Sequence, residues 1–232
     1  NLMRDSIYAG MPEYAEKYSS GQTNGTHWVP AEVDVSIRPG WYYHPEQDDK
    51  VKSLNKLMDI YYESVGRNGS LLLNFPVDKR GLIHENDIRQ LQAMAKQIKV
   101  DFAHNLAWES KASTSSYRGK GYEAKRVLDG DKKTYWATAD NVIQASLTIE
   151  FNQSTTFNRL LVQEYIQLGQ RVKSFVVEAR NDGAWREIIR ETTIGYKRIL
   201  RFTDVTATAV RLKILDSKAC PTISNVEIFY AP

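Results

Sequence analysis

Short runs of strand-forming residues follow one another from residue 145 to residue 230, and they constrain the fold more than any other feature. The runs are ASLTIEF (145–151), RLLVQEY (159–165), VKSFVVEAR (172–180), RILRF (198–202), AVRLKIL (209–215) and VEIFY (226–230). Several of them alternate apolar and polar residues, as strands with one face in a core do. Turn-forming residues separate the runs, and no long helical segment intervenes. From about residue 105 onward the sequence therefore predicts an antiparallel β-sandwich or jelly roll.

The first hundred residues predict a different architecture. Apolar residues at helical spacing indicate helices over 51–65 and 85–99. The segments 31–37 and 70–75 are typical of short strands, and the second is apolar enough for a buried parallel strand. The order strand–helix–strand–helix favours a parallel α/β architecture. The sequence therefore predicts an α/β part over residues 1–103 and an all-β part over residues 104–232.

Composition narrows the possible functions. The net charge is only +3 and no basic block reaches five or six charges, so we expect no nucleic-acid partner. No apolar run approaches the roughly 18 residues that a membrane span needs. The single cysteine, Cys220, excludes an internal disulfide and a multi-cysteine zinc site. The first residues carry neither an initiator Met nor a signal-peptide pattern, which indicates a processed or truncated start.

Two groups of motifs resemble known families. In the second half, YEAKRVLDGDKKTYWAT (122–138), FNRLLVQEYIQLGQRVKSFVVEA (157–179) and ISNVEIF (223–229) resemble the discoidin-type, or coagulation-factor C-type, domain that many glycosidases carry as a sugar-binding module. In the first half, WVPAEVDVSIRPGWYYH (28–44) and SVGRNGSLLLNFPVDKRGLIHENDI (64–88) resemble α-L-fucosidases, in particular a subgroup that prefers branched α-1,3/1,4-linked fucose. The resemblance implies the C-terminal portion of a (β/α)8-like catalytic barrel followed by a discoidin-type β-sandwich.

The resemblance also implies a reaction, the retaining hydrolysis of terminal α-L-fucosyl linkages. Glu32 and Asp34 are two apart on a predicted strand, so they share one face and their spacing alone would allow a catalytic pair. In the family, however, the nucleophile and the acid/base lie in sequence contexts that do not occur here, and we expect both upstream of this chain. The implied partners are a fucosylated glycan and the remainder of the barrel, and the implied location is extracellular or periplasmic.

The first half contains four candidate substrate-binding residues. Trp41 is the strongest, because an aromatic face can bury the apolar methyl edge of fucose and the matching family position carries such an aromatic. Glu32 is expected to order the substrate or to form a salt bridge with Arg38. Arg38 offers donors to sugar hydroxyls unless a salt bridge occupies it. Asn74, at a strand end, is expected either to bind substrate or to brace a neighbouring loop.

A glycine-containing loop in the second half is a candidate cation site. Residues at positions 0, +3, +5 and +8 offer a backbone carbonyl, two carboxylates and a hydroxyl, which suit a hard cation such as Ca²⁺: Arg126, Asp129, Asp131 and Thr134. The discoidin-type resemblance implies the same spacing and adds the Val226 carbonyl and Glu227 from the last strand. Such a Ca²⁺ would pin the loop to that strand. The alternatives are Asx-turn hydrogen bonds, Na⁺ or water.

Other classes of function stay open. The chain could be a non-catalytic, lectin-like protein whose β-sandwich is its only working site, or an adhesion module. Candidates for sugar contact at the loop end of the sandwich are Tyr117, Arg118, Tyr122, Tyr165 and Tyr196. The histidines His27, His84 and His104 have no metal-ligand or catalytic spacing, and we interpret them as structural.

Overall fold

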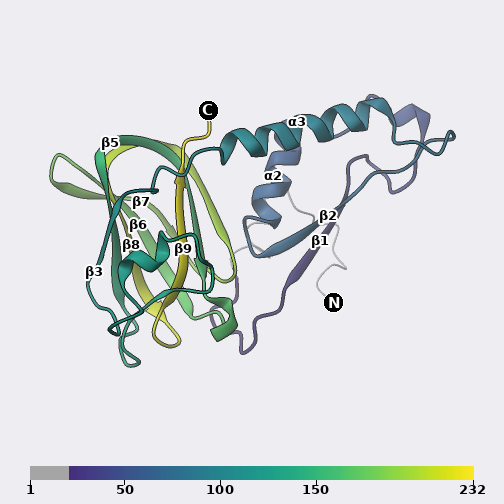
Figure 1. The fold of residues 1–232 in the computed structure, drawn as a ribbon. Coiled ribbons are helices and arrows are strands. Elements are labelled where there is room, and N and C mark those ends of the chain that lie inside the picture. The colour runs from purple at the N-terminus through teal and green to yellow at the C-terminus, as the bar shows by residue number, and fades with distance from the viewer. Residues whose placement is uncertain (1–20) are drawn as a thin grey trace. The chain divides into compact units, whose positions relative to one another are not determined.

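The computed structural model describes residues 21–232, which divide into two compact units. The first unit consists of residues 30–101, and the second consists of residues 21–29 and 102–232. Figure 1 labels the elements of both units. Within the described residues, no helix combines the length and the apolarity that crossing a membrane would require.

A two-stranded parallel sheet and two helices form the first unit (Figure 1). Strand β1 (Ala31–Ser36) pairs in parallel with β2 (Gly69–Asn74). The short 3-10 helix η1 (Pro45–Gln47) and then helix α2 (Leu54–Ser64) follow β1, and helix α3 (Glu85–Asp101) follows β2. Val33 and Val35 of β1 are buried against Ile60 of α2. The predicted α/β order is thereby confirmed. Helix α2 starts three residues later than predicted, because the Ser53 side chain caps it by accepting the Lys56 N–H.

The second unit is all β apart from two 3-10 helices, and its strands wrap around one core (Figure 1). The strand order is β4-β9-β5-β8-β6-β7, with β3 on β5, and every pairing is antiparallel. The elements are β3 (Lys111–Thr114), η2 (Ala124–Val127), β4 (Trp136–Ala137), β5 (Ala145–Glu164), η3 (Ile166–Leu168), β6 (Val172–Asn181), β7 (Ala184–Glu191), β8 (Arg198–Ser217) and β9 (Thr222–Phe229). The all-β prediction for this half is confirmed.

Strands β5 and β8 are longer than the sequence predicted. The runs 145–151 and 159–165 belong to one strand, and so do 198–202 and 209–215, so the prediction of separate strands was wrong. Neither intervening segment contains Gly or Pro, and both are rich in β-branched Thr, which keeps the backbone extended. Instead, β5 bends at a register shift between Glu150 and Thr155. Its first half pairs with β3 and its second half with β9, so two different strands share one edge of β5.

Large aromatic side chains fill the sandwich core. Trp136, Phe157 and Phe175 have no exposed surface and belong to one cluster of buried residues from all parts of the sheet. The Trp136 indole donates a hydrogen bond to the Ser116 carbonyl at 3.0 Å, so its single polar atom is satisfied. The burial of these rings stabilises the second unit independently of any ligand.

A buried carboxylate connects three segments at the end of β5. Glu164 is 2% exposed, and its Oε1 accepts the N–H groups of Arg171 at 2.7 Å and Val172 at 2.9 Å. Its Oε2 accepts the Gly195 N–H at 2.7 Å. Burial raises the pKa of Glu164 to about 7, although the three N–H donors favour the charged form and act in the opposite direction.

Candidate functional site

The loop after β1 presents two exposed aromatic residues. Trp41 is 51% exposed and Tyr42 is 79% exposed. The Ser36 hydroxyl donates to the Gly40 carbonyl at 2.7 Å, and Asn74 Nδ2 donates to the Trp41 carbonyl at 3.0 Å. Asn74 therefore braces the loop from the end of the neighbouring strand. A direct contact between Asn74 and substrate stays a prediction. We call residues 38–48 the rim loop.

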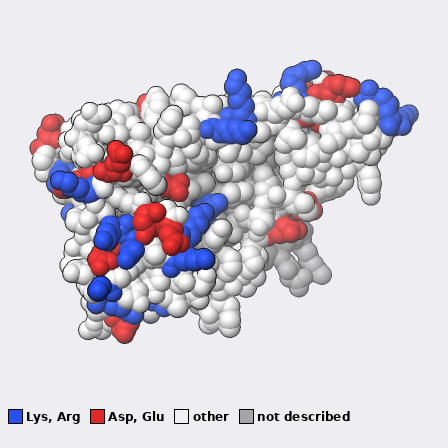
Figure 2. Space-filling view, in the orientation of Figure 1, with Lys and Arg blue, Asp and Glu red and all other residues white. Residues whose placement is uncertain are grey.

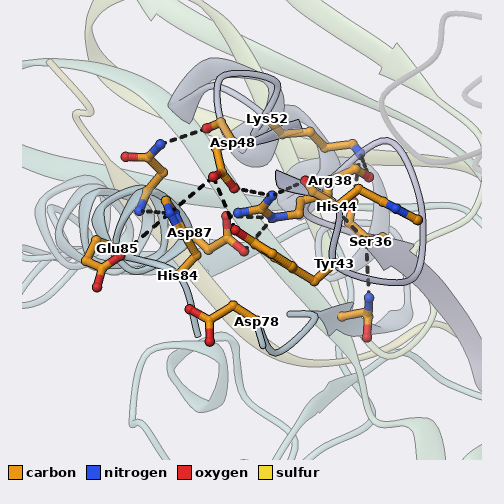
Figure 3. Close-up of polar contacts among 12 residues, drawn as sticks. Ser36, Arg38, Tyr43, His44, Asp48, Lys52, Asp78, His84, Glu85 and Asp87 are labelled. Atoms are coloured by element: carbon orange, nitrogen blue, oxygen red, sulfur yellow. Dashed lines mark hydrogen bonds and ion pairs between the residues drawn. The ribbon is translucent and has the colours of Figure 1, made fainter. Parts of the chain in front are cut away.

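Arg38 anchors the rim loop from inside (Figure 3). Its guanidinium is fully buried, and Nε donates to both carboxylate oxygens of Asp87 on α3, at 3.1 and 2.9 Å. Nη1 donates to Asp48 at 2.8 Å. The carboxylates that pair with Arg38 are thus Asp48 and Asp87, not Glu32 as the sequence suggested. Within residues 21–232 Nη2 has no hydrogen-bond partner but is buried, so Arg38 exposes no donor in this structure, and its sugar contact stays a prediction.

Asp48 connects the rim loop to the residues that precede α3. Its Oδ2 accepts the Tyr43 hydroxyl at 3.2 Å and lies 3.3 Å from His84 Nε2 (Figure 3). Desolvation raises the pKa of Asp48, but the hydrogen bond from Arg38 and the positive field of His84 outweigh it, and the pKa lies below its ordinary value. Lys52 Nζ donates to two backbone carbonyls at the end of β1, at 2.7 and 3.2 Å. The rim loop is therefore held by side chains at both of its ends.

Glu32 and Asp34 lie outside this network. They are exposed on one face of β1, because the alternating residues Val33 and Val35 point into the packing against α2. Leu72 of β2 is also 52% exposed. The shared face of the two carboxylates agrees with the alternation of the sequence, whereas the role of Glu32 in ordering a substrate stays a prediction.

The candidate cation loop of the second unit brings oxygen atoms together. Thr134 Oγ1 lies 2.7 Å from Asp129 Oδ2 and 3.1 Å from the Asp131 carbonyl oxygen, and Asp129 Oδ1 accepts the Asp131 N–H. The Arg126 guanidinium lies 3.6 Å from Asp129 Oδ2. Figure 2 shows acidic and basic side chains interspersed over the face around η2. The N–H groups of Asp131 and Lys133 donate to the Oδ1 atoms of Asp129 and Asp131, which are the Asx-turn hydrogen bonds that the sequence left as an alternative. The same oxygen types would also suit Ca²⁺, which stays a prediction.

The second part of the predicted ligand set belongs to β9. Helix η2 packs against β9, the strand of Val226 and Glu227, and Glu227 Oε1 accepts a hydrogen bond from Asn225 Nδ2 at 2.7 Å. In residues 21–232, His, Cys, Asp and Glu side chains form no group of three or more that could hold a metal ion. An ion here would therefore depend on backbone carbonyls and the Thr134 hydroxyl as well as on carboxylates.

The loop end of the sandwich carries a tyrosine cluster. The rings of Tyr135 and Tyr165 stack with centroids 4.4 Å apart, and Tyr122 lies 5.3 Å from Tyr135. The Arg118 guanidinium lies over the Tyr122 ring at 5.6 Å. The structure thus brings together three of the sequence candidates and adds Tyr135, which the sequence offered no signal to select. Tyr196 packs in a separate aromatic pair.

Two family models match the chain, one for each unit. Residues 2–102 match the model of the α-L-fucosidase family, and residues 110–228 match that of the F5/8 type C domain. The chain is an α-L-fucosidase family segment joined to an F5/8 type C domain. Both resemblances predicted from the motifs are confirmed at this level, whereas the α-1,3/1,4 subgroup stays a prediction.

Relatives of this segment agree with both family matches. A putative alpha-L-fucosidase 1 from Oryza sativa subsp. japonica is 39% identical over 223 residues, which are 94% of this chain and 42% of the rice protein. A putative α-L-fucosidase from Bacteroides thetaiotaomicron superposes with a TM-score of 0.86 at 40% identity, over 94% of this chain and 49% of that chain. A Ruminococcus gnavus GH29 fucosidase solved with fucose superposes with a TM-score of 0.84 at 30% identity, over 91% of this chain and 43% of that one. The chain spans less than half the length of each.

Proposed function

We propose that this chain is the C-terminal portion of an exo-acting α-L-fucosidase that removes terminal fucose, α-1,3/1,4-linked, from a glycan. In this proposal the first unit supplies the last β/α units of a (β/α)8-like barrel. The observation that carries it is the position of the rim loop, which starts directly after β1 and is braced by Asn74 at the end of the parallel neighbour β2. Active sites of such barrels form at the carboxyl ends of the strands, which is where these groups lie.

The residues of this chain would bind and position the sugar. The exposed Trp41 face would bury the C5-methyl edge of fucose. Glu32 is the second residue of β1, near the amino end of that strand, so the position of the rim loop does not support its predicted hydrogen bonds to sugar hydroxyls. Arg38 would act mainly through the rim loop, since its pairs with Asp48 and Asp87 fix the backbone on which Trp41 stands. In the retaining mechanism one carboxylate attacks the anomeric carbon and a second carboxylic acid protonates the leaving oxygen. Both would come from polypeptide that precedes this chain.

The second unit would support the enzyme rather than perform its chemistry. A Ca²⁺ held by the 126–134 loop, the Val226 carbonyl and Glu227 would tie η2 to β9 and act structurally. We further propose an extracellular or periplasmic location. The lectin-like alternative would use the tyrosine cluster as its only site, and no observation favours it over the fucosidase.

Fucose release from an α-1,3/1,4-fucosylated oligosaccharide tests the proposal. We expect no turnover by the 232-residue chain alone, and turnover when it is produced together with the polypeptide that precedes it. In that complete enzyme Trp41→Ala should raise KM at least as strongly as it lowers kcat, whereas Tyr230→Ala, an exposed aromatic of the second unit, should change neither. Turnover by the chain alone would refute the upstream position of the catalytic pair and make Glu32 and Asp34 the first residues to mutate. No turnover in either form would refute the fucosidase itself.

A further inference from the structure

A depression on the second unit is lined by none of the residues of the tyrosine cluster. Its volume is about 430 Å³, within the range of roughly 300–1,000 Å³ that is usual for small-molecule sites. One wall is the turn before β3 and the other is the bend of β5. The residues that line it are Leu106, Trp108, Ser110, Phe151, Asn152, Gln153, Ser154, Thr155 and Thr156. We call it the Trp108 depression.

Hydrogen bonds hold the backbone of the turn that carries Trp108. Trp108 is 61% exposed, although the neighbouring Ala107 is fully buried. Its backbone N–H donates to the Asn105 carbonyl at 3.1 Å, and Asn105 Oδ1 accepts the N–H groups of Ala107 and Ile228, both at 3.0 Å. Glu109 follows with a φ of 68°, a left-handed conformation that few residues adopt without a compensating gain. The hydrogen-bonded turn thus fixes the backbone of Trp108, whose large aromatic side chain is mostly exposed.

The opposite wall is polar because β5 leaves its ladder there. The register shift between Glu150 and Thr155 leaves residues 151–154 unpaired with β8. Asn152, Gln153 and Ser154 are exposed, and Asn152 Nδ2 donates to the Glu109 carbonyl at 3.4 Å, which connects the two walls. Phe151 is packed against the sandwich core and closes the floor. The bend therefore presents two amides and several hydroxyls opposite the Trp108 ring.

The chemistry of this lining selects a class of ligand. None of the lining residues carries a formal charge, so the depression offers nothing to a phosphate or a carboxylate. An aromatic platform facing amides and hydroxyls suits a molecule with an apolar C–H face and neutral hydroxyls on its edges. We propose that the Trp108 depression binds a neutral oligosaccharide, with the Trp108 indole stacked on a pyranose ring and Asn152 and Gln153 bonded to its hydroxyls. This site is independent of the fucosidase proposal.

Titration of the 232-residue chain with fucose-free oligosaccharides tests this site separately from fucose release. The probes are cellotetraose, N-acetylated chitotetraose and β-1,4-galactotetraose, each followed by NMR on the indole N–H signals of the five tryptophans. Production in a bacterial host leaves the Asn152-Gln-Ser154 sequon unmodified, so no N-glycan covers the depression. We expect at least one probe to shift the Trp108 signal, which Trp108→Phe identifies by its disappearance.

Two variants locate the binding. Trp108→Ala should weaken the affinity for the shifting probe by about tenfold or more, as expected for the loss of a stacked aromatic contact. Ser154→Arg should block the depression while leaving the Trp108 turn intact. The matched control Tyr230→Ala and the tyrosine-cluster variant Tyr165→Ala should bind as the parent chain does. The proposal is overturned if no probe binds, if Trp108→Ala and Ser154→Arg bind normally, or if Tyr165→Ala alone removes the binding.

Discussion

Replacement of Glu164 by Gln is expected to change how the stability of the β-sandwich depends on pH. Burial raises the pKa of Glu164 from its ordinary value of 4.5 to about 7 in the folded protein. Because the folded-state pKa lies above the unfolded one, the contribution of Glu164 is most favourable below pH 4.5 and is lost as the pH rises to about 7. The gap between the two pKa values corresponds to about 3 kcal/mol of unfolding free energy.

The structure also sets the pH-independent cost of the variant. The side-chain oxygen of the new amide could still accept the N–H groups of Arg171 and Val172, but the amide nitrogen would face the Gly195 N–H. The loss of that one hydrogen bond costs about 1 kcal/mol. Glu164→Gln should thus be less stable than the parent chain by about 1 kcal/mol at pH 4 and more stable by about 2 kcal/mol at pH 8.

Urea unfolding at a series of pH values from 4 to 8 measures both curves. Tryptophan fluorescence reports the transition, since Trp136 is fully buried in the sandwich core. Glu187→Gln, at an exposed position of β7 where the carboxylate pairs with Arg190, is the control and should differ from the parent chain by less than about 1 kcal/mol. The reasoning is refuted if the parent chain gains stability relative to Glu164→Gln as the pH rises, because the three N–H donors would then outweigh desolvation.

Two further predictions concern the rim loop and the cation loop. Asp87→Ala should destabilise the first unit by about 3–5 kcal/mol, because it leaves the fully buried Arg38 without its main partner. The control Asp49→Ala, at an exposed position, should cost under about 0.5 kcal/mol. Equal urea midpoints of the two variants would contradict the anchoring role of Arg38. Ca²⁺ should raise the Tm of the second unit over that measured in EDTA, and Asp129→Ala should abolish the difference; a Tm that does not respond to Ca²⁺ would contradict the structural ion.

The sequence by itself determined the class of each half. In the second half apolar residues recur every two residues, and in the first half segments of helical spacing alternate with segments of strand spacing. These spacings are local properties, because the geometry of each helix or strand decides which of its residues share a face. The same local character made the motifs around Trp41 and Asp129 recognisable, and it placed Glu32 and Asp34 on one face of β1. The predicted runs were wrong where β5 and β8 continue through Thr-rich segments without a turn, and they did not include β7.

Only the tertiary structure decided which side chains meet. Arg38 pairs with Asp48 and with Asp87, 10 and 49 residues away, and no sequence pattern distinguishes these carboxylates from Glu32, which is closer in the chain. Likewise, the Trp108 depression exists because the bend of β5 lies beside a turn more than 40 residues earlier in the chain, and Asn152 reaches that turn across it. Such encounters depend on how elements pack, and packing is a property of the whole fold rather than of any segment.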